Sequence, residues 1–333
     1  MSPRKSPKDV PSFNVQVVPG KLSVQIYRHE VDYFKPVPCW TYITEGLWAH
    51  KQKEVILTLR RDAQGDNGEP PRFPLQIIES IYRLAAQGKL VDTWGYSYFV
   101  LTAVKERKAA VFYVAYLYPL PLSGIRLPSP ALTAILMSKD DYEVFRAFGL
   151  TRLVAARGNH YRYYPCPPWS ELPLPEIVSM QRMQRSLLGK MPRIHLQGST
   201  VTMEGSDITL RLQPKAQRIL ESQLGKIEPN QPLALLPELD PKANACLTWN
   251  PEKNITAMNV PPNSDLSQKA GCFVAFIPEQ AENSSRIFED GFVVMVTTNI
   301  WMKIREAMVS GQPMVVPTEG TPRQFRLEYV PSA

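Results

Sequence analysis

The sequence predicts an α+β protein of two lobes, with mixed, largely antiparallel sheets and amphipathic helices packed on them. Strand-like segments outnumber helix-like segments, which disfavours a regular alternation of parallel strands and helices. A strand followed by an amphipathic helix recurs three times, without sequence identity between the copies, at Glu54–Gln87, Asp207–Gln223 and Phe292–Ser310. A chain of 333 residues, 44% of them hydrophobic and 21% charged, is long enough for one large domain or two ordinary ones.

The first lobe is expected to span residues 13–190 after a flexible tail over residues 1–12, and the second lobe residues 191–333. Strands of the first lobe are indicated by short apolar runs and by alternation of apolar and polar residues, and Pro19-Gly20 predicts a hairpin between the first two. The strand-like segments are Asn14–Val18, Leu22–Tyr27, Trp40–Leu47, Glu54–Arg61, Val111–Tyr118, Leu132–Met137 and Leu150–Ala156.

Three helices are predicted in the first lobe. The apolar residues of Leu75–Gln87 recur at helical spacing, and Gly88 suits the position just after a last turn. Asp140–Phe148 suits a short helix, and Ile177–Leu188 gathers its methionines and leucines on one side. The boundary between the lobes is expected just after this third helix.

The second lobe contains the clearest alternation in the chain, at Asp207–Gln213. Pro214 is expected to begin a helix over Lys215–Gln223, and Asn299 to cap a later helix that ends at Gly311. The remaining predicted strands are Ser199–Met203, Ala245–Trp249, Ile255–Val260, Cys272–Ile277, Phe292–Thr297, Met314–Val316 and Phe325–Val330.

Composition indicates a cytoplasmic protein. The formal net charge of +7 is spread in pairs of mixed sign, which predicts a solvated mixed surface and no nucleic-acid partner. Cys39, Cys166, Cys246 and Cys272 lie far apart without a C-x-x-C pair, as suits a reducing compartment. No apolar run approaches the ~20 residues that cross a bilayer, so we expect no transmembrane segment. The start of the chain lacks the apolar core of a signal peptide.

Motifs for catalysis or cofactor binding are missing from the sequence. There is no glycine-rich phosphate loop, no nucleophile elbow and no H-E-x-x-H, so we predict no catalytic residue, cofactor or metal site. A pocket assembled by the fold around Cys166, His160 or His195 is the alternative, but a cysteine between prolines is more typical of an inert buried thiol. Glu289 and Asp290 are expected in a solvated hairpin turn.

Tyr161–Ser170 is the most unusual stretch, with four aromatic residues, three prolines, a cysteine and an arginine. As structure, its tyrosines would be partly buried and its prolines would stiffen the backbone. As a surface, exposed aromatics and an arginine beside rigid prolines suit partner binding, framed by the proline-rich Pro119–Pro130. A polyproline ligand at Pro165–Pro168 is a third possibility. The residues proposed to bind a partner are Tyr161, Arg162, Tyr163, Tyr164, Pro165, Pro168 and Trp169.

The run Tyr161–Pro167 matches the pattern Y-R-[YF]-Y-P-C-P at every position. On this run the chain resembles the C-terminal domain of SARA and endofin, which are FYVE-finger endosomal proteins. Other stretches resemble that domain in the same order. They are Tyr42–Leu47, Ile81-Tyr82 through Val91, Gly198 through Gln213, and Glu289–Gly291 running into Val294–Thr297. The resemblance covers roughly residues 38–311. A fainter likeness joins Thr44–Leu47, Glu54–Arg61 and the helix after Phe73-Pro74 to Suppressor-of-fused-like domains.

The resemblance implies a scaffold region that contributes to partner binding, without assigned catalytic residues. This chain has no clustered cysteine pairs for a FYVE finger and no room for a Smad-binding segment, so we expect the domain to stand alone, with a bacterial source as one option. We therefore predict a non-enzymatic protein-interaction module. The alternatives are an immunity-type protein that binds a toxin, and an enzyme or small-ligand binder with a pocket near Cys166 and His160.

Overall fold

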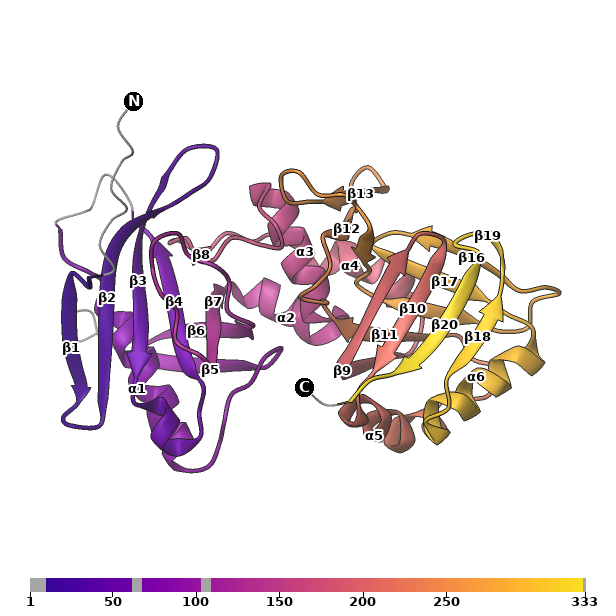
Figure 1. The fold of residues 1–333 in the computed structure, drawn as a ribbon, viewed down its shortest axis with the longest axis horizontal. Helices are drawn as coiled ribbons and strands as arrows, with labels where there is room; N and C mark the ends of the chain where they lie inside the picture. Colours follow the sequence, from indigo (N-terminus) through magenta and orange to yellow (C-terminus); the bar gives the residue numbers. More distant parts are fainter. Residues whose placement is uncertain (1–9, 62–67, 103–108, 332–333) are drawn as a thin grey trace. The chain divides into compact units, whose positions relative to one another are not determined.

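The structure is a computed structural model that describes residues 10–61, 68–102 and 109–331 (Figure 1). These residues form two compact units. Unit 1 comprises the described residues up to Lys139 together with Pro168–Glu176, and unit 2 comprises Asp140–Pro167 and the described residues from Ile177 onward. Most of the predicted tail, residues 1–9, lies outside the described residues.

This division differs from the predicted lobe boundary at residue 190. Each unit is assembled from two separate segments of the chain. The helix at Leu150–Tyr161 (α3) was placed in the first lobe, but it contacts strands Leu233–Glu238 (β11) and Ala245–Asn250 (β12) of unit 2. Because such contacts join residues far apart in the chain, local sequence patterns did not reveal them.

Unit 1 contains an eight-stranded sheet with the order β1-β2-β3-β4-β7-β6-β5, and β8 pairs with β4. The β4–β7 and β4–β8 ladders are parallel and the other ladders are antiparallel. The strands are Phe13–Val18 (β1), Leu22–Val31 (β2), Val37–Glu45 (β3), Glu54–Arg60 (β4), Tyr96–Thr102 (β5), Ala109–Leu117 (β6), Ala131–Met137 (β7) and Trp169–Ser170 (β8). A short helix, η1 (Leu47–His50), connects β3 to β4.

The core of unit 1 lies between its sheet and α1 (Phe73–Ala86), which confirms the predicted amphipathic helix with a start two residues earlier. Pro74 occupies the first turn, where its missing N–H costs no hydrogen bond, and Gly88 follows the helix at φ 75°. Ile77 and Ile81 of α1 are buried against the apolar side chains of the sheet.

Unit 2 contains a twelve-stranded mixed sheet. Its main path runs β13-β12-β14-β9-β11-β15-β17-β16-β19, and β10, β20 and β18 extend from β9. Six strands are Arg193–Glu204 (β9), Asp207–Leu212 (β10), β11, β12, Ile255–Asn259 (β13) and Gln268–Ala270 (β14). The others are Val274–Ile277 (β15), Ser284–Phe288 (β16), Gly291–Met295 (β17), Met314–Pro317 (β18), Glu319–Thr321 (β19) and Gln324–Tyr329 (β20). With both sheets mixed and helices packed on them, the predicted α+β class is confirmed.

The helices of unit 2 are α2, α3, α4, α5 and α6, with the short helices η2 and η3. Their bounds are Lys139–Phe148 (α2), Leu150–Tyr161 (α3), Met180–Gln184 (α4), Leu187–Lys190 (η2), Pro214–Gln223 (α5), Leu224–Lys226 (η3) and Thr298–Ser310 (α6). Among the described residues, none of the helices is both long and apolar enough to span a bilayer.

The structure corrects three sequence-based predictions in this unit. The strand-like run Leu150–Ala156 is the first half of α3. The single helix predicted over Ile177–Leu188 is divided into α4 and η2, because Ser186 is extended at ψ 166°. The helix predicted to begin after Asn299 begins earlier, and the Thr297 hydroxyl accepts the capping bond from the Ile300 N–H at 3.4 Å.

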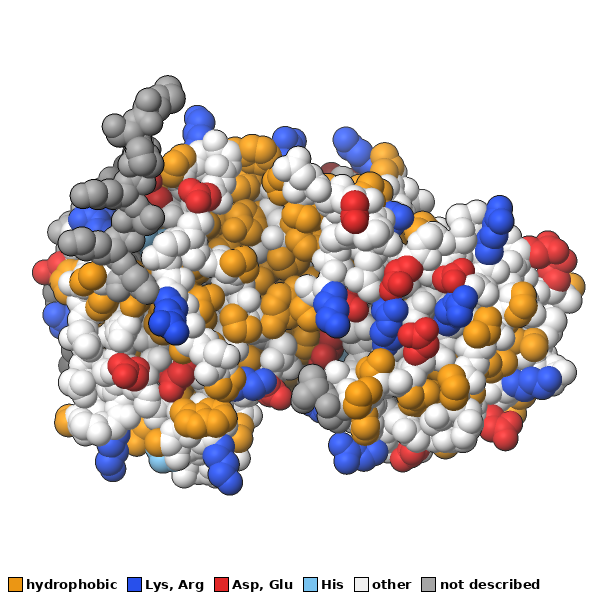
Figure 2. Space-filling model, viewed as in Figure 1, with side chains coloured by type: hydrophobic (Ala, Val, Ile, Leu, Met, Phe, Trp, Pro, Cys, Tyr) orange, Lys and Arg blue, Asp and Glu red, His pale blue; other side chains and the backbone are white. Residues whose placement is uncertain are grey.

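Two surfaces of the unit 2 sheet differ sharply. On the helix-covered side, Trp301 of α6 stacks on Phe276 with ring centroids 5.1 Å apart, and Phe325 meets Phe276 edge-on at 5.2 Å. Over β9, β10 and β20, acidic and basic side chains are interspersed (Figure 2), and Arg211 pairs with Glu204 at 2.7 Å. This part of the surface is therefore a network of compensated charges.

We predict that Trp301→Ala lowers the free energy of unfolding by about 3 to 5 kcal/mol, because it leaves a cavity in the centre of this core. The neighbouring Met302 is 44% exposed on the same helix, so Met302→Ala should change stability by about 0.5 kcal/mol or less. Chemical denaturation of both variants measures the difference. Similar values for the two would contradict the described packing of α6.

Candidate functional site

The aromatic-proline segment begins at the end of α3. Arg162 adopts a left-handed conformation at φ 53°, and its N–H bonds to the carbonyls of Gly158 and Asn159, which ends the helix. Tyr161, Tyr163 and Tyr164 are half-buried and Arg162 is exposed. This first half of the segment therefore retains surface that a partner could reach.

The second half of the segment is buried. Trp169 is only 1% exposed, and its ring meets Tyr33 of unit 1 edge-on at 5.6 Å. Pro165 and Pro168 are buried as well. The prediction that Pro165, Pro168 and Trp169 belong to a partner surface is therefore corrected: in this half of the segment the structural interpretation holds. The reason is that Trp169 and Ser170 form β8, which pairs with β4.

A polar and a steric constraint fix the path of the segment in unit 2. The Asn259 side chain donates hydrogen bonds to the carbonyls of Tyr163 at 3.0 Å and Pro165 at 3.1 Å. The Tyr164 hydroxyl donates to the carbonyl of Ala243. At Gly158 a Cβ atom would lie 2.0 Å from the Pro165 carbonyl oxygen, so only glycine permits this approach of segment and helix.

Cys166 lies in the buried half of the segment, and burial raises the pKa of its thiol to about 12. At neutral pH the thiol is therefore protonated and a poor nucleophile. His160 is exposed on α3, and His195 is exposed on β9 with a pKa lowered by partial burial. The arrangement does not support the alternative of a Cys166 nucleophile.

Arg152 of α3 occupies the centre of a buried charge cluster that local sequence patterns did not predict. Its guanidinium donates from Nε to Asp290 Oδ2 at 2.7 Å and from Nη2 to Glu289 Oε2 at 2.9 Å, with a further bond to Asp290 Oδ1. Its Nη1 donates to Ser186 Oγ at 3.2 Å and contacts Met183 Sδ at 3.7 Å. The guanidinium is therefore fully engaged by the protein.

The three charged side chains of the cluster are shielded from solvent. Arg152 is 2% exposed, Glu289 5% and Asp290 2%. Trp249 and Phe273 each place a ring centroid 5.5 Å from the guanidinium carbon, a distance that suits cation–π attraction. The solvated turn predicted at Glu289-Asp290 is therefore wrong. The sequence correctly predicted a turn at these two residues. The turn is buried because Arg152, from a distant part of the chain, pairs with both carboxylates.

Electrostatics in the cluster follow from burial and pairing. Burial acts to lower the pKa of Arg152, but the charges and hydrogen bonds of Asp290 and Glu289 outweigh it, so the pKa is raised and the guanidinium stays charged. Burial raises the pKa of Glu289, against the attraction of Arg152 and the hydrogen bond from the Leu187 N–H at 2.7 Å. Two carboxylates facing one guanidinium leave one negative charge uncompensated within the cluster.

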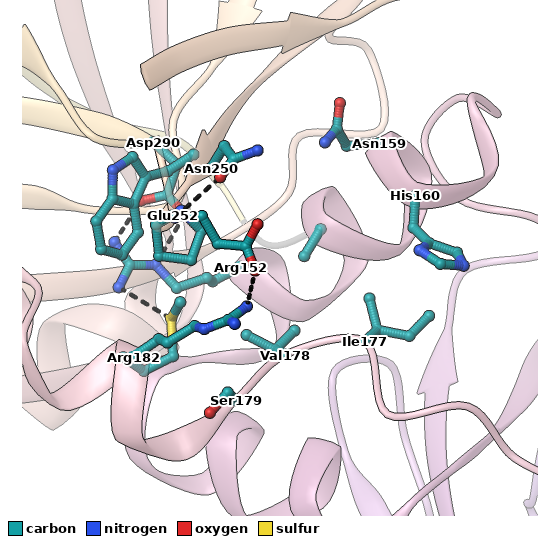
Figure 3. A pocket seen from close by; sticks show the side chains of 14 residues that line it. Arg152, Asn159, His160, Ile177, Val178, Ser179, Arg182, Asn250, Glu252 and Asp290 are labelled. Carbon is teal, nitrogen blue, oxygen red and sulfur yellow. Dashed lines mark hydrogen bonds and ion pairs between the residues drawn. The ribbon is translucent and has the colours of Figure 1, made fainter. Parts of the chain in front are cut away.

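A pocket of about 270 Å³ opens beside this cluster (Figure 3). One face of α3 lines it with Arg152, Ala156, Asn159 and His160. Counted from Ala156, the other three lie four residues before it and three and four residues after it, so all four project from the same side of the helix. The other walls come from the segment before and through α4, from the β12–β13 hairpin and from the β16–β17 turn. These residues are Ile177, Val178, Ser179, Arg182, Met183, Trp249, Asn250, Pro251, Glu252 and Asp290.

The rim of the pocket is polar. Figure 3 shows Arg182 and Glu252 pointing toward one another, and their ion pair measures 2.7 Å. Asn250 Oδ1 accepts bonds from the backbone N–H groups of Glu252 at 2.9 Å and Lys253 at 3.2 Å, which shapes the hairpin turn. Of the residues considered for a fold-assembled pocket, His160 lines this one, whereas Cys166 and His195 are not among its lining residues.

The predicted site residues are thus only partly brought together. Tyr161 and Arg162 directly follow the pocket-lining Asn159 and His160, but the buried half of the segment contributes nothing to the pocket. Sequence reasoning missed Arg152 and Arg182. One signal was available for the first: an arginine inside the apolar run Leu150–Ala156 requires a buried partner.

Comparison with known proteins gives a partial relative and distant structural likenesses. No protein-family model matches the chain. A stretch of 134 residues, 40% of this chain, is 31% identical to the human Zinc finger FYVE domain-containing protein 9, and the match covers 9% of that protein. This likeness supports the resemblance to FYVE-finger proteins over part of the chain. The crystal structure of Drosophila Suppressor of Fused aligns over 92% of this chain and 88% of its own, with 8% identity and a TM-score of 0.34, which is too low to support an argument.

We predict that Asp290→Asn lowers the free energy of unfolding by about 3 to 5 kcal/mol, because Arg152 loses the partner that engages two of its nitrogens. Glu289→Gln should cost less, since its amide oxygen can still accept the Leu187 N–H and the excess negative charge is removed. Chemical denaturation at neutral pH compares the two variants. A larger loss for Glu289→Gln would contradict the described pairing.

The raised pKa of Glu289 also predicts a pH dependence. A carboxyl whose pKa is higher in the folded state contributes stability below its ordinary value of 4.5, and this contribution is lost as the pH rises through the folded value. The stability of the wild type relative to Glu289→Gln should therefore fall as the pH rises above 4.5. Denaturation midpoints of both proteins across this range measure it, and a constant difference would show that the pKa is not raised.

Proposed function

We propose that this protein is a non-enzymatic protein-interaction module that binds a partner protein through the pocket beside α3. The observation that carries the proposal is the mutual pairing of the charged groups at the pocket. Arg152 is engaged by Glu289 and Asp290, and Arg182 pairs with Glu252. Such groups are held in place by one another, so they suit holding a shape better than transferring protons.

What remains for a partner is a lining of aliphatic side chains and amide groups, with the exposed His160 beside them. Ala156, Ile177 and Val178 supply aliphatic surface, while Asn159 and Asn250 supply amide groups at the edge. This combination is typical of a site that takes one uncharged side chain of a protein and hydrogen-bonds its backbone. We infer that an apolar side chain of the partner enters the pocket.

The exposed half of the aromatic-proline segment extends this surface. Tyr161 and Arg162 come directly after the pocket-lining end of α3, and tyrosine and arginine are common anchor residues at protein interfaces. The proposal therefore keeps Tyr161, Arg162, Tyr163 and Tyr164 as partner-binding residues. The proline-rich Pro119–Pro130 belongs to unit 1 and is not needed for the proposed site.

The partial relative supports the same class of function, because the resemblance to FYVE-finger proteins implies a region that contributes to partner binding. The free cysteines Cys39, Cys166, Cys246 and Cys272 are all buried as thiols, which favours a reducing compartment such as the cytoplasm.

We predict that Ala156→Phe abolishes partner binding, because its ring fills the pocket that the partner side chain would occupy. Affinity capture from cells that express the protein, followed by mass spectrometry, compares the wild type with this variant. Recovery of a genuine partner should fall by about tenfold or more.

Ala156→Ser is the matched control, since it changes the same position without filling the pocket, and it should retain the partner. Both variants should melt cooperatively near the wild-type temperature. Undiminished recovery with a folded Ala156→Phe protein would contradict the proposed site.

A further inference from the structure

Among the described residues, β13 lies at a free edge of the unit 2 sheet. It pairs with β12 on one side and ends the strand order of the main sheet path (Figure 1). Its first four residues are exposed, with Ile255 at 53% and Met258 at 44%. A strand with unpaired backbone groups and exposed apolar side chains is a template for pairing with another chain.

This edge lacks the features that usually prevent such pairing. None of the five residues of β13 is charged and none is proline, whereas prolines flank the strand at Pro251 and Pro261. The opposite end of the same sheet path is β19, which has three residues and begins with the charged Glu319. Of these two ends, β13 therefore offers the longer and uncharged edge, about 17 Å of strand. Among the described residues a further edge strand, β18, pairs only with β20 and ends in Pro317.

Cations lie at both ends of this edge. Lys253 is exposed in the turn that precedes β13. At the other end Asn259 binds the Tyr163 carbonyl, which places the exposed Arg162 nearby, and Tyr164 binds the carbonyl next to Lys242.

Within the described part of the chain, Lys253, Arg162 and Lys242 form no ion pair. The nearest carboxylate in sequence, Glu252, already pairs with Arg182. The edge is thus uncharged in its middle and positively charged at its ends, which favours a segment of the opposite pattern.

We propose that β13 binds an extended segment of the partner protein as an additional strand, with an uncharged, β-prone centre and acidic residues at its ends. This inference rests on the proposed function, because a protein partner supplies the segment. Backbone hydrogen bonds to β13 would provide affinity, and Lys253 and Arg162 would select acidic ends.

The test uses a fluorescent synthetic peptide whose centre alternates valine and threonine and whose ends are aspartate and glutamate. We expect it to bind the full-length protein in an anisotropy titration. A peptide of the same sequence with N-methylated backbone amides should bind about tenfold more weakly or worse, because it cannot pair as a strand. A peptide with lysine ends should also bind about tenfold more weakly.

Protein variants test the same site from the other side. Lys253→Glu combined with Arg162→Glu should weaken binding of the acidic peptide about tenfold. Lys303 is an exposed lysine on α6, and Lys303→Glu is the control that should leave this binding unchanged. Met258→Asp should weaken it as well, and Met302→Asp is matched to it because both methionines are 44% exposed.

Three results would overturn the inference: no binding of the acidic peptide, equal binding of its N-methylated form, or self-association of the protein that Met258→Asp abolishes. The last would assign the edge to a second copy of this chain. None of these bears on the pocket, so loss of the captured partner with Ala156→Phe would leave the proposed function standing while the β13 inference fails.

Discussion

Unit 2 depends on keeping one buried guanidinium satisfied. Arg152 lies on the buried side of α3, where an unpaired charge would cost several kcal/mol. The cost is offset by hydrogen bonds that Arg152 donates to Asp290, Glu289 and Ser186, which come from two distant parts of the chain. The Leu187 N–H also donates to Glu289. These contacts join α3, the residues between α4 and η2, and the buried β16–β17 turn in one cluster.

The same cluster determines what kind of surface the unit presents. Because the N–H donors of Arg152 bind internal partners, the pocket beside it offers aliphatic and amide groups, His160 and the paired Arg182 and Glu252. Such a surface recognises shape and backbone polarity better than it polarises a bond. Binding at the proposed site would be linked to stability, since the residues that shape the pocket wall also hold the unit together.

Tight backbone approach is the second constraint. Gly158 allows the aromatic-proline segment to pack closely against α3. The side-chain amide of Asn259 donates hydrogen bonds to two backbone carbonyls of that segment. Asn259 also ends β13, so the segment and the edge strand are fixed to one another. This shared anchor is why the half-buried tyrosines, the exposed Arg162 and the strand edge lie close together within unit 2.

The sequence by itself determined the α+β class, helix α1 and most strands, because apolar periodicity records which face of an element is buried. It also singled out the Tyr161–Ser170 segment, although not which half is exposed. Only the tertiary structure decided the make-up of the units, the burial of Trp169 and of Glu289-Asp290, and the existence of the pocket. These features depend on pairings such as Arg152 with Asp290, 138 residues apart, and local patterns carry no information on which distant residue compensates a buried charge.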